Sequence, residues 1–429
     1  MYSGITYFRT KSSYYSYKCF LEMIILNSWK KVKWFFCATL LACSFVSFPV
    51  NSDEEMEHKL HLPVVSEKTT ADSKAPVINA LAAVVVETSS GRVLYSKNAT
   101  ERRSIASTTK IMTAVVALEN GNPDDIVTIS KRAASIGGSA IGLQTGQEYT
   151  LKELLYAMLM NSANDAAVAI AEHIGGTVEG FAEMMNRKAK ALGMSDSHYV
   201  TPHGLDAADQ YSSAYDVAII TRHALKNPLF AEIVSTTSSH ISGYSLYNTN
   251  ELLGTCPGVD GVKTGYTGKA GRCLVTTAQR DGMRLISVVL GSPTRTARAN
   301  ASRDLLDYAY SNYSMYRLLS AGEAYTCIPV YRGVYEKVDL KASHDVVLPL
   351  SSSEAESLVV KEILPDRLNA PVYAGTDTGR LEYVLNGQVV GESMLLVSKN
   401  IRRKNYVDYL ATVLKSWGRM MREGIFSGT

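Results

Sequence analysis

The sequence lacks several features that mark large classes of proteins. Its 429 residues carry a net charge of only +3, so no global field favours binding to nucleic acid. It contains no glycine-rich phosphate loop, no zinc-ligand spacing and no internal repeat. We therefore expect no nucleic-acid partner, and no motif indicates nucleotide or metal chemistry.

Cysteine is scarce, with six residues in the whole chain. Beyond the N-terminal region only Cys256, Cys273 and Cys327 remain. An odd number of cysteines at such wide spacing does not form a disulfide framework. We expect these three side chains to be buried as small apolar residues.

Near the N-terminus, three lysines precede the apolar run WFFCATLLACSFVSF at 34–48. This run has about the length of a signal peptide and is short for a membrane-spanning helix. We predict a signal region at residues 1–52 and an exported protein, with Met23 as an alternative start. A retained, uncleaved anchor is the alternative to cleavage.

The remaining chain, 46 % hydrophobic overall, is long enough for two domains or more. We expect four segments after the signal region: a polar linker, a domain of helices and strands, a β-rich domain and a basic amphipathic helix. Their predicted bounds are 53–76, 77–323, 324–397 and 398–429. Short apolar runs and turn signals such as Asn386-Gly387 indicate that the β-rich domain is a sandwich or a partly open barrel.

Strand patterns stand at both ends of the segment 77–323, and helical patterns fill its middle. Two β-like runs surround a turn near 90, and two more surround Arg280-Asp281-Gly282. Between them, apolar residues recur at helical spacing in segments that begin near 107, 151, 164, 180 and 215. We predict an α/β (α+β) domain in which helices pack on an antiparallel sheet whose first and last strands are neighbours.

Ser107 and Lys110 stand one helical turn apart at the start of an apolar helix pattern. A serine hydroxyl is a weak nucleophile until a base takes its proton, and a neighbouring lysine can do so when its amine is neutral. The apolar residues that follow Lys110 would lower its pKa by burial. The alternative is a capped helix whose lysine points to water, and the pair alone is weak support for catalysis.

Two further stretches add polar groups that suit a peptide substrate. Ser162-Ala163-Asn164 stands where two helices meet, and offers a hydroxyl for proton transfer and an amide to orient a peptide bond. Its alternative role is a helix cap. Lys263-Thr264-Gly265 lies in a β-like segment and offers a cation and a hydroxyl for a carboxylate, beside a residue without a side chain. Its alternative role is an exposed lysine before a turn.

In this order and at these separations, the three motifs resemble the signature of penicillin-binding proteins and class A β-lactamases. The chain is most similar to the low-molecular-mass penicillin-binding proteins that act as D-alanyl-D-alanine carboxypeptidases, the serine-type S11 peptidases. Supporting stretches are SIASTTKIMTA, NSANDAA, TPHGLD and PGVDGVKTGYTGKAG. The resemblance covers about residues 76–320, and extends more loosely to the β-rich domain and the terminal helix.

The resemblance implies a catalytic role for three residues. Ser107 would be acylated by the penultimate D-alanine of a peptidoglycan stem peptide, Lys110 would be its general base, and Ser162 would relay protons. The oxyanion hole would use the backbone N–H of Ser107 and one near Tyr266 or Thr267. No metal and no cofactor are required.

The resemblance also implies a set of substrate-binding residues. These are Asn164, Lys263, Thr264, Gly265 and Arg298. Arg295 is an alternative to Arg298. His203 and Asp206 in TPHGLD fit the family pattern, and we assign them structural roles.

The sequence departs from the β-lactamases in two places. Ala163 stands where their motif has aspartate, and no glutamate between 165 and 262 stands in an E-x-x-L-N context. A penicilloyl enzyme should therefore hydrolyse slowly, which indicates a target of β-lactam antibiotics rather than a resistance enzyme.

The leading hypothesis is an exported serine carboxypeptidase that removes the terminal D-alanine from stem pentapeptides at the outer face of the cytoplasmic membrane. A D,D-endopeptidase or a β-lactamase on the same fold are alternatives, which the extra C-terminal domain and helix disfavour. A non-catalytic cell-wall-binding protein is a hypothesis of another class. The basic helix at 398–429 carries Trp417 and suits a membrane surface, or else docks on its own domain.

Overall fold

The computed structural model describes residues 75–426. The predicted signal region at 1–52 and nearly all of the predicted linker at 53–76 lie outside the described residues.

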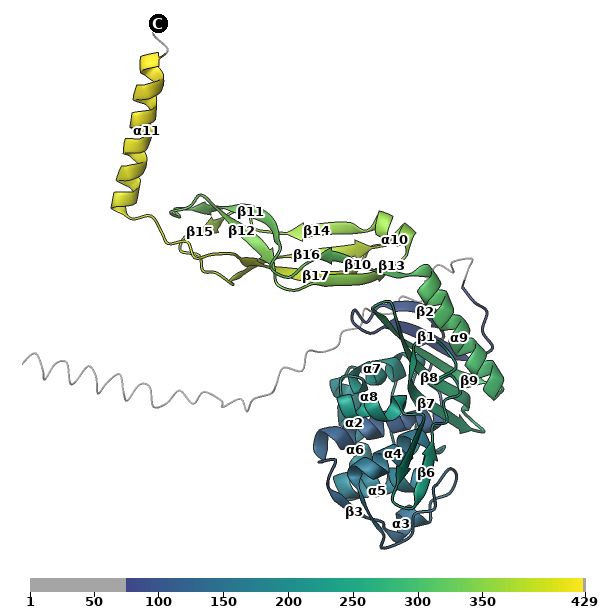
Figure 1. The fold of residues 1–429 in the computed structure, drawn as a ribbon. Coiled ribbons are helices and arrows are strands. Elements are labelled where there is room, and N and C mark those ends of the chain that lie inside the picture. Colours follow the sequence, from purple (N-terminus) through teal and green to yellow (C-terminus); the bar gives the residue numbers. More distant parts are fainter. Residues whose placement is uncertain (1–74, 427–429) are drawn as a thin grey trace, which may run out of the picture. The chain divides into compact units, whose positions relative to one another are not determined.

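A five-stranded antiparallel sheet forms the centre of the first folded region (Figure 1). Its strands lie in the order β2 (Val93–Lys97), β1 (Ala82–Glu87), β9 (Met283–Ser292), β8 (Gly271–Arg280) and β7 (Val259–Thr267). β1 pairs with β9, so the first and last strands are neighbours, as predicted. All six residues of β1 are buried, as its nearly continuous apolar run indicates for a strand covered on both faces.

Helices cover both faces of this sheet. On one face, α9 (Arg295–Asn312) packs its Leu305 and Leu306 against Leu274 and Val289 of the sheet. The helices on the other face are α2 (Lys110–Asn120), α4 (Leu151–Met160), α5 (Asn164–Gly175), α6 (Val178–Ala191), α7 (Ala214–Ala224) and α8 (Pro228–Ser235). This arrangement confirms the predicted fold class.

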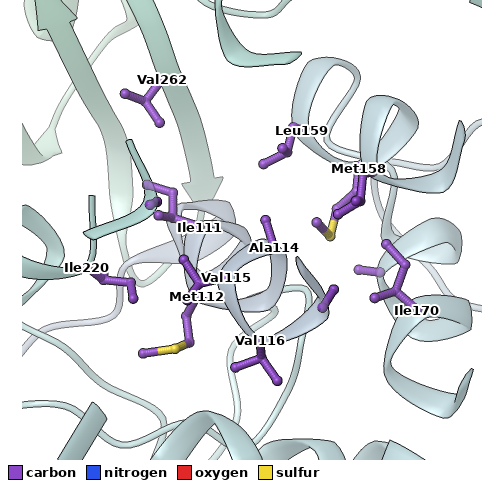
Figure 2. Packing of buried hydrophobic residues seen from close by; sticks show 14 of the residues in the cluster. Ile111, Met112, Ala114, Val115, Val116, Met158, Leu159, Ile170, Ile220 and Val262 are labelled. Carbon is purple, nitrogen blue, oxygen red and sulfur yellow. The ribbon is translucent and has the colours of Figure 1, made fainter. Parts of the chain in front are cut away.

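Helix α2 runs through the middle of the larger core. Its first eight residues are all buried, including Lys110. Figure 2 shows Met112 and Val116 of α2 together with Leu159 of α4, Ile170 of α5 and Val262 of β7. Because the first eight residues of α2 are buried and mostly apolar, the lysine at its first turn lies in a medium that disfavours charge.

The predicted helix positions in the middle of the domain are confirmed, and local signals explain their ends. Thr150 and Glu153 form a capping box at the start of α4. Gly193, at a φ of 75°, follows the end of α6. The sequence did not predict α9, because its apolar positions are mostly alanines set among arginines and asparagines. It also missed α8 and the small elements α3 (Lys131–Ala134), β3 (Ile126–Thr128), β4 (Glu148–Thr150), β5 (Ser238–Ile241) and β6 (Tyr244–Tyr247).

The second folded region is β-rich, as predicted. One sheet has the order β14-β16-β17-β12-β11-β15, and β10 (Ser314–Leu319) pairs with β13 (Val346–Leu350). The other bounds are β11 (Ala324–Tyr331), β12 (Lys337–Ala342), α10 (Ser352–Ser357), β14 (Val359–Ile363), β15 (Leu368–Asn369), β16 (Asp377–Leu385) and β17 (Gln388–Val397). Its core, which includes Leu340, Leu381 and Leu395, is separate from the two cores of the first region.

The last element is α11 (Tyr406–Phe426). Its large apolar side chains are exposed, with 63 % of Trp417 and 57 % of Leu414 accessible. Within the described part of the chain, no helix is both long and apolar enough to span a bilayer.

Two of the three cysteine predictions hold. Cys256 and Cys273 are buried, whereas Cys327 is exposed. Cys327 lies on β11, where buried and exposed residues alternate near the end of the strand, and its side chain is on the outer face. The prediction of burial was therefore wrong for Cys327.

Candidate active site

Ser107 lies on a short 3-10 turn, η2 (Ala106–Thr109), that leads directly into α2. The sequence predicted one continuous helix here. The turn begins at Ala106, whose φ is 48°, a left-handed value that few side chains adopt. A 3-10 turn sets residues three apart on one side, so Ser107 and Lys110 still face each other.

Backbone packing holds this turn in place. Gly204, at a φ of 82°, lies so close to the turn that a β-carbon there would stand 2.0 Å from the carbonyl oxygen of Ala106. Gly265 of β7 approaches from another side, and its β-carbon would stand 3.0 Å from the backbone nitrogen of Ser107. Close approach therefore requires a glycine at 204, in TPHGLD, and makes a side chain tight at Gly265, in the Lys263-Thr264-Gly265 (KTG) motif.

The Lys110 amine has three oxygen neighbours. Its Nζ lies 2.9 Å from the Ser107 Oγ, 2.7 Å from the Asn164 Oδ1 and 2.8 Å from the His203 carbonyl oxygen. Lys110 is fully buried. Burial, and secondly the positive charge of Lys263, hold its pKa well below the ordinary value for lysine.

These contacts define what a neutral Lys110 can do. A carbonyl oxygen only accepts, so Asn164 and His203 would take the two N–H bonds of the uncharged amine. The remaining lone pair of the nitrogen then points to the Ser107 hydroxyl, which can donate. The arrangement suits proton transfer from Ser107 to Lys110.

The second motif closes the site from the junction of α4 and α5. Ser162 has a φ of 62° and is 7 % exposed, and Asn164 is the first residue of α5. The Asn164 Nδ2 donates to the carbonyl oxygen of Gly137 at 2.8 Å, which fixes the amide oxygen toward Lys110. Within the described residues, no hydrogen bond joins the Ser162 hydroxyl to Lys110 or Lys263.

The third motif lies on β7, the edge strand of the sheet. The Lys263 Nζ donates to the Thr264 carbonyl oxygen at 3.0 Å, and burial lowers the pKa of Lys263 to about 7, with a smaller contribution from Arg298. The Thr264 hydroxyl lies 2.7 Å from the hydroxyl of Thr249. An edge strand beside a nucleophile leaves room for a peptide to pair along it.

Comparisons with known proteins identify the family of the chain. The family model described as D-alanyl-D-alanine carboxypeptidase matches residues 68–294, and the model described as penicillin-binding protein 5, C-terminal domain, matches 313–403. The D-alanyl-D-alanine carboxypeptidase DacF of Bacillus subtilis is 37 % identical over 349 residues, which are 79 % of this chain and 90 % of the relative. The chain belongs to the D-alanyl-D-alanine carboxypeptidase family.

Other members of the family support the same assignment. DacA of Escherichia coli is 32 % identical over 360 residues, covering 80 % of this chain and 89 % of the relative. The crystal structure of penicillin-binding protein 5 from Haemophilus influenzae superposes with a TM-score of 0.69 at 33 % identity, over 76 % of this chain and 99 % of that one. The predicted resemblance is thereby confirmed, together with the penicillin-binding fold.

Arg298, the predicted carboxylate ligand of this family member, is buried beside the KTG strand. Its Nε and Nη2 donate to the carboxylate of Glu251 at 3.0 and 2.8 Å, and its Nη1 donates to the Cys273 carbonyl oxygen at 3.3 Å. The alternative, Arg295, is an exposed residue at the start of α9. The structure therefore brings Arg298, and not Arg295, into contact with Cys273 of β8, the residue that pairs with Gly265 of β7.

Sequence reasoning missed several contacts in this carboxypeptidase site. His203 contributes its main-chain oxygen rather than its ring, and burial lowers the pKa of that ring to about 4. Asp206 accepts a hydrogen bond from the Thr267 hydroxyl at 2.9 Å, which ties TPHGLD to the end of β7. Thr249 and Glu251 gave no sequence signal, because they act on KTG and Arg298 only through the folded chain.

Proposed function

We propose that this protein removes the terminal D-alanine from peptidoglycan stem pentapeptides through an acyl-enzyme on Ser107. The observation that carries the proposal is the 2.9 Å contact between the Ser107 Oγ and a buried Lys110 whose other two neighbours are carbonyl oxygens. The match to the family model over 68–294 supports the substrate class. No metal or cofactor takes part in the proposed steps.

Acylation begins when Lys110 takes the hydroxyl proton and the Ser107 oxygen bonds to the carbonyl carbon of the penultimate D-alanine. The developing oxyanion accepts hydrogen bonds from the backbone N–H groups of Ser107 and of Tyr266 or Thr267. Lys110 then returns its proton through the Ser162 hydroxyl to the leaving nitrogen, the C–N bond breaks, and free D-alanine departs. In the second half, water attacks the ester carbon and gives a proton to Lys110. The C–O bond to Ser107 then breaks, Lys110 passes the proton to the Ser107 oxygen, and the shortened peptide leaves as a carboxylic acid.

The substrate is held by the motifs around the nucleophile. Asn164 orients the peptide bond, while Lys263 and Thr264 bind the terminal carboxylate, assisted by Arg298. Gly265, predicted as a substrate-binding residue, acts by letting β7 pack closely against the turn that carries Ser107. The substrate carboxylate stabilises the charged form of the buried Lys263, because its negative charge compensates for the loss of hydration of the amine.

Three of the glutamates between 165 and 262 bind side chains outside the catalytic group, which supports slow hydrolysis of a penicilloyl enzyme. Glu172 binds Ser130, Glu232 binds Tyr156, and Glu251 binds Arg298. None of these carboxylates is hydrogen-bonded to Ser107 or Lys110. The protein is therefore proposed as a target of β-lactams, not a β-lactamase.

Export and membrane association complete the proposal. The signal region places the enzyme outside the cytoplasmic membrane, and α11 lies along the membrane surface. Its apolar face carries Leu410, Leu414 and Trp417, whose exposed fractions are 49, 57 and 63 %. Basic residues at both ends of α11 favour an anionic leaflet.

A substrate assay separates the proposed activity from its alternatives. We expect release of D-alanine from a stem pentapeptide, faster than cleavage of a crosslinked dimer, and only slow turnover of nitrocefin. The Ser107→Ala variant is the control and should release nothing. Faster cleavage of the dimer would make the protein an endopeptidase, and no release with any substrate would favour the non-catalytic wall-binding protein.

The two lysines predict a bell-shaped dependence of kcat/KM on pH. Lys110 must be neutral, so the rate rises as pH passes its lowered pKa. Lys263 must be charged to bind the carboxylate, so kcat/KM of the free enzyme falls above about pH 7. The corresponding fall in kcat should occur at higher pH, because the carboxylate of the bound substrate stabilises the protonated form of Lys263. Equal alkaline limbs in both profiles would contradict the role of Lys263.

A further inference from the structure

We propose that one end of the β-rich domain is itself a binding surface for anionic lipid headgroups. Three segments form it: the turn at 331–336, the loop at 367–374 and the chain at 399–404 that leads into α11. We call it the tyrosine–cation surface. The inference rests on the proposal that α11 lies on a membrane and extends it, because it adds a second, rigid point of attachment.

Backbone hydrogen bonds lock the three segments together. The N–H of Val334 donates to the Arg402 carbonyl at 3.1 Å, and the N–H of Lys404 donates to the Arg332 carbonyl at 2.8 Å. Val372 and Ile401 bond each other in both directions. The chain at 399–404 is therefore part of the domain and not a free tether. It connects the turn and the loop directly to the start of α11.

Exposed tyrosines on this surface are stacked with cations. The ring of Tyr331, which is 48 % exposed, has the Arg332 guanidinium at 5.0 Å and the Arg367 guanidinium at 5.3 Å from its centre. The Lys399 amine lies 4.6 Å from the ring centre of Tyr335, which is 56 % exposed. Such amphipathic rings beside cations are typical of residues that lie at headgroup level in a membrane interface.

Positive charge on the surface is largely uncompensated. Arg402 is paired with Asp408, but within residues 75–426 no ion pair neutralises the remaining cations. These are Arg332, Arg367, Lys399, Arg403 and Lys404. Three carboxylates stand on or beside the same segments: Glu336, Asp366, and Asp408, whose pKa is lowered chiefly by its bond to Arg402 and also by Lys404. Exposed arginines without an ion-pair partner suit phosphate groups, which they bind with two parallel hydrogen bonds.

Continuity with α11 identifies the occupant as a membrane. Lys404 lies 5.9 Å from the ring centre of Tyr409, so the cations of the surface meet the first turn of the helix. Tyr406 and Val407, which begin α11, are 83 and 69 % exposed. Apolar helix residues directly beside stacked tyrosines and unpaired cations fit a single bilayer surface with anionic headgroups.

Binding of the full-length protein to vesicles tests the proposal. The Arg332→Gln/Arg367→Gln variant should bind vesicles containing phosphatidylglycerol about fivefold more weakly for each charge removed, hence roughly 25-fold in total. Vesicles of phosphatidylcholine alone should show no such difference. The Arg187→Gln/Lys226→Gln variant removes the same charge from exposed positions on α6 and after α7, and should bind like the wild type. The Arg332→Lys/Arg367→Lys variant, which keeps both charges, should restore binding.

A third variant distinguishes this surface from α11. Leu414→Glu/Trp417→Glu should weaken binding but leave weak, salt-sensitive binding to anionic vesicles. This remaining binding should disappear when the two arginine changes are added. If the arginine variant binds as tightly as its charge-matched control, the tyrosine–cation surface is not a lipid site, whatever α11 does. If the α11 variant alone binds like the wild type, the proposal for α11 fails, and a selective loss in the arginine variant would still support the surface. An unchanged melting temperature and unchanged penicillin labelling exclude misfolding.

Discussion

Replacing Lys110 by methionine should lower the rate of acylation by at least about 10³-fold, within the range that general-base catalysis contributes. Methionine has a similar volume and no basic nitrogen, so the Ser107 proton has no acceptor. The Ser107 hydroxyl would keep its position on η2, because backbone packing and not Lys110 sets the turn. Stopped-flow labelling with a fluorescent penicillin measures the rate directly.

A second substitution separates proton transfer from charge. Arginine at 110 keeps a positive charge and can donate to Asn164 and His203, but it stays protonated in proteins and cannot act as a base. Lys110→Arg should therefore be as inactive as Lys110→Met. Substantial acylation by the arginine variant would show that Lys110 acts by its charge alone.

The free energy of unfolding of the methionine variant should stay within about 1 kcal/mol of the wild type, since the lost hydrogen bonds are offset by the removal of a buried amine.

Gly204→Ala should destabilise the protein by about 2–4 kcal/mol, from overpacking together with a left-handed φ. The new β-carbon would stand 2.0 Å from the Ala106 oxygen and 2.6 Å from its carbonyl carbon, so the turn that carries Ser107 must shift. A displacement of about 1 Å can lower a rate by roughly 10²-fold. Denaturant unfolding and penicillin labelling give the two quantities.

The control for Gly204 is a glycine with the same backbone conformation in open space. Gly243 has a φ of 84° in the turn between β5 and β6, and nothing lies within 4 Å of the position of its β-carbon. Gly243→Ala should cost only about 1 kcal/mol, from the left-handed φ alone, with unchanged acylation. If both variants acylate at the wild-type rate, then Gly204 does not position the nucleophile.

Sequence spacing was sufficient to predict contacts between residues that are close together in the chain. Ser107 and Lys110 are three residues apart, and both a 3-10 turn and an α-helix bring such a pair together. The strands β1 and β9 were predictable because their apolar runs are nearly uninterrupted. The order of the three motifs also identified the family, although it gave no distances.

Contacts between distant parts of the chain could not be predicted from spacing. The two carbonyl oxygens that hold Lys110 belong to residues 54 and 93 positions further along. Arg298 meets Glu251 across 47 residues, from a helix whose alanine-rich face carries little periodic signal. These pairings arise from the packing of helices on the sheet, which the motifs themselves do not encode.

The central claim is that Ser107 is the nucleophile and that the buried amine of Lys110 activates it. Intact mass spectrometry after incubation with benzylpenicillin tests it most directly. The wild-type protein should gain the mass of a single penicilloyl group, and Ser107→Ala should gain none while keeping its melting temperature. A penicilloyl adduct on Ser107→Ala, or a wild-type protein that stays unlabelled, would contradict the account.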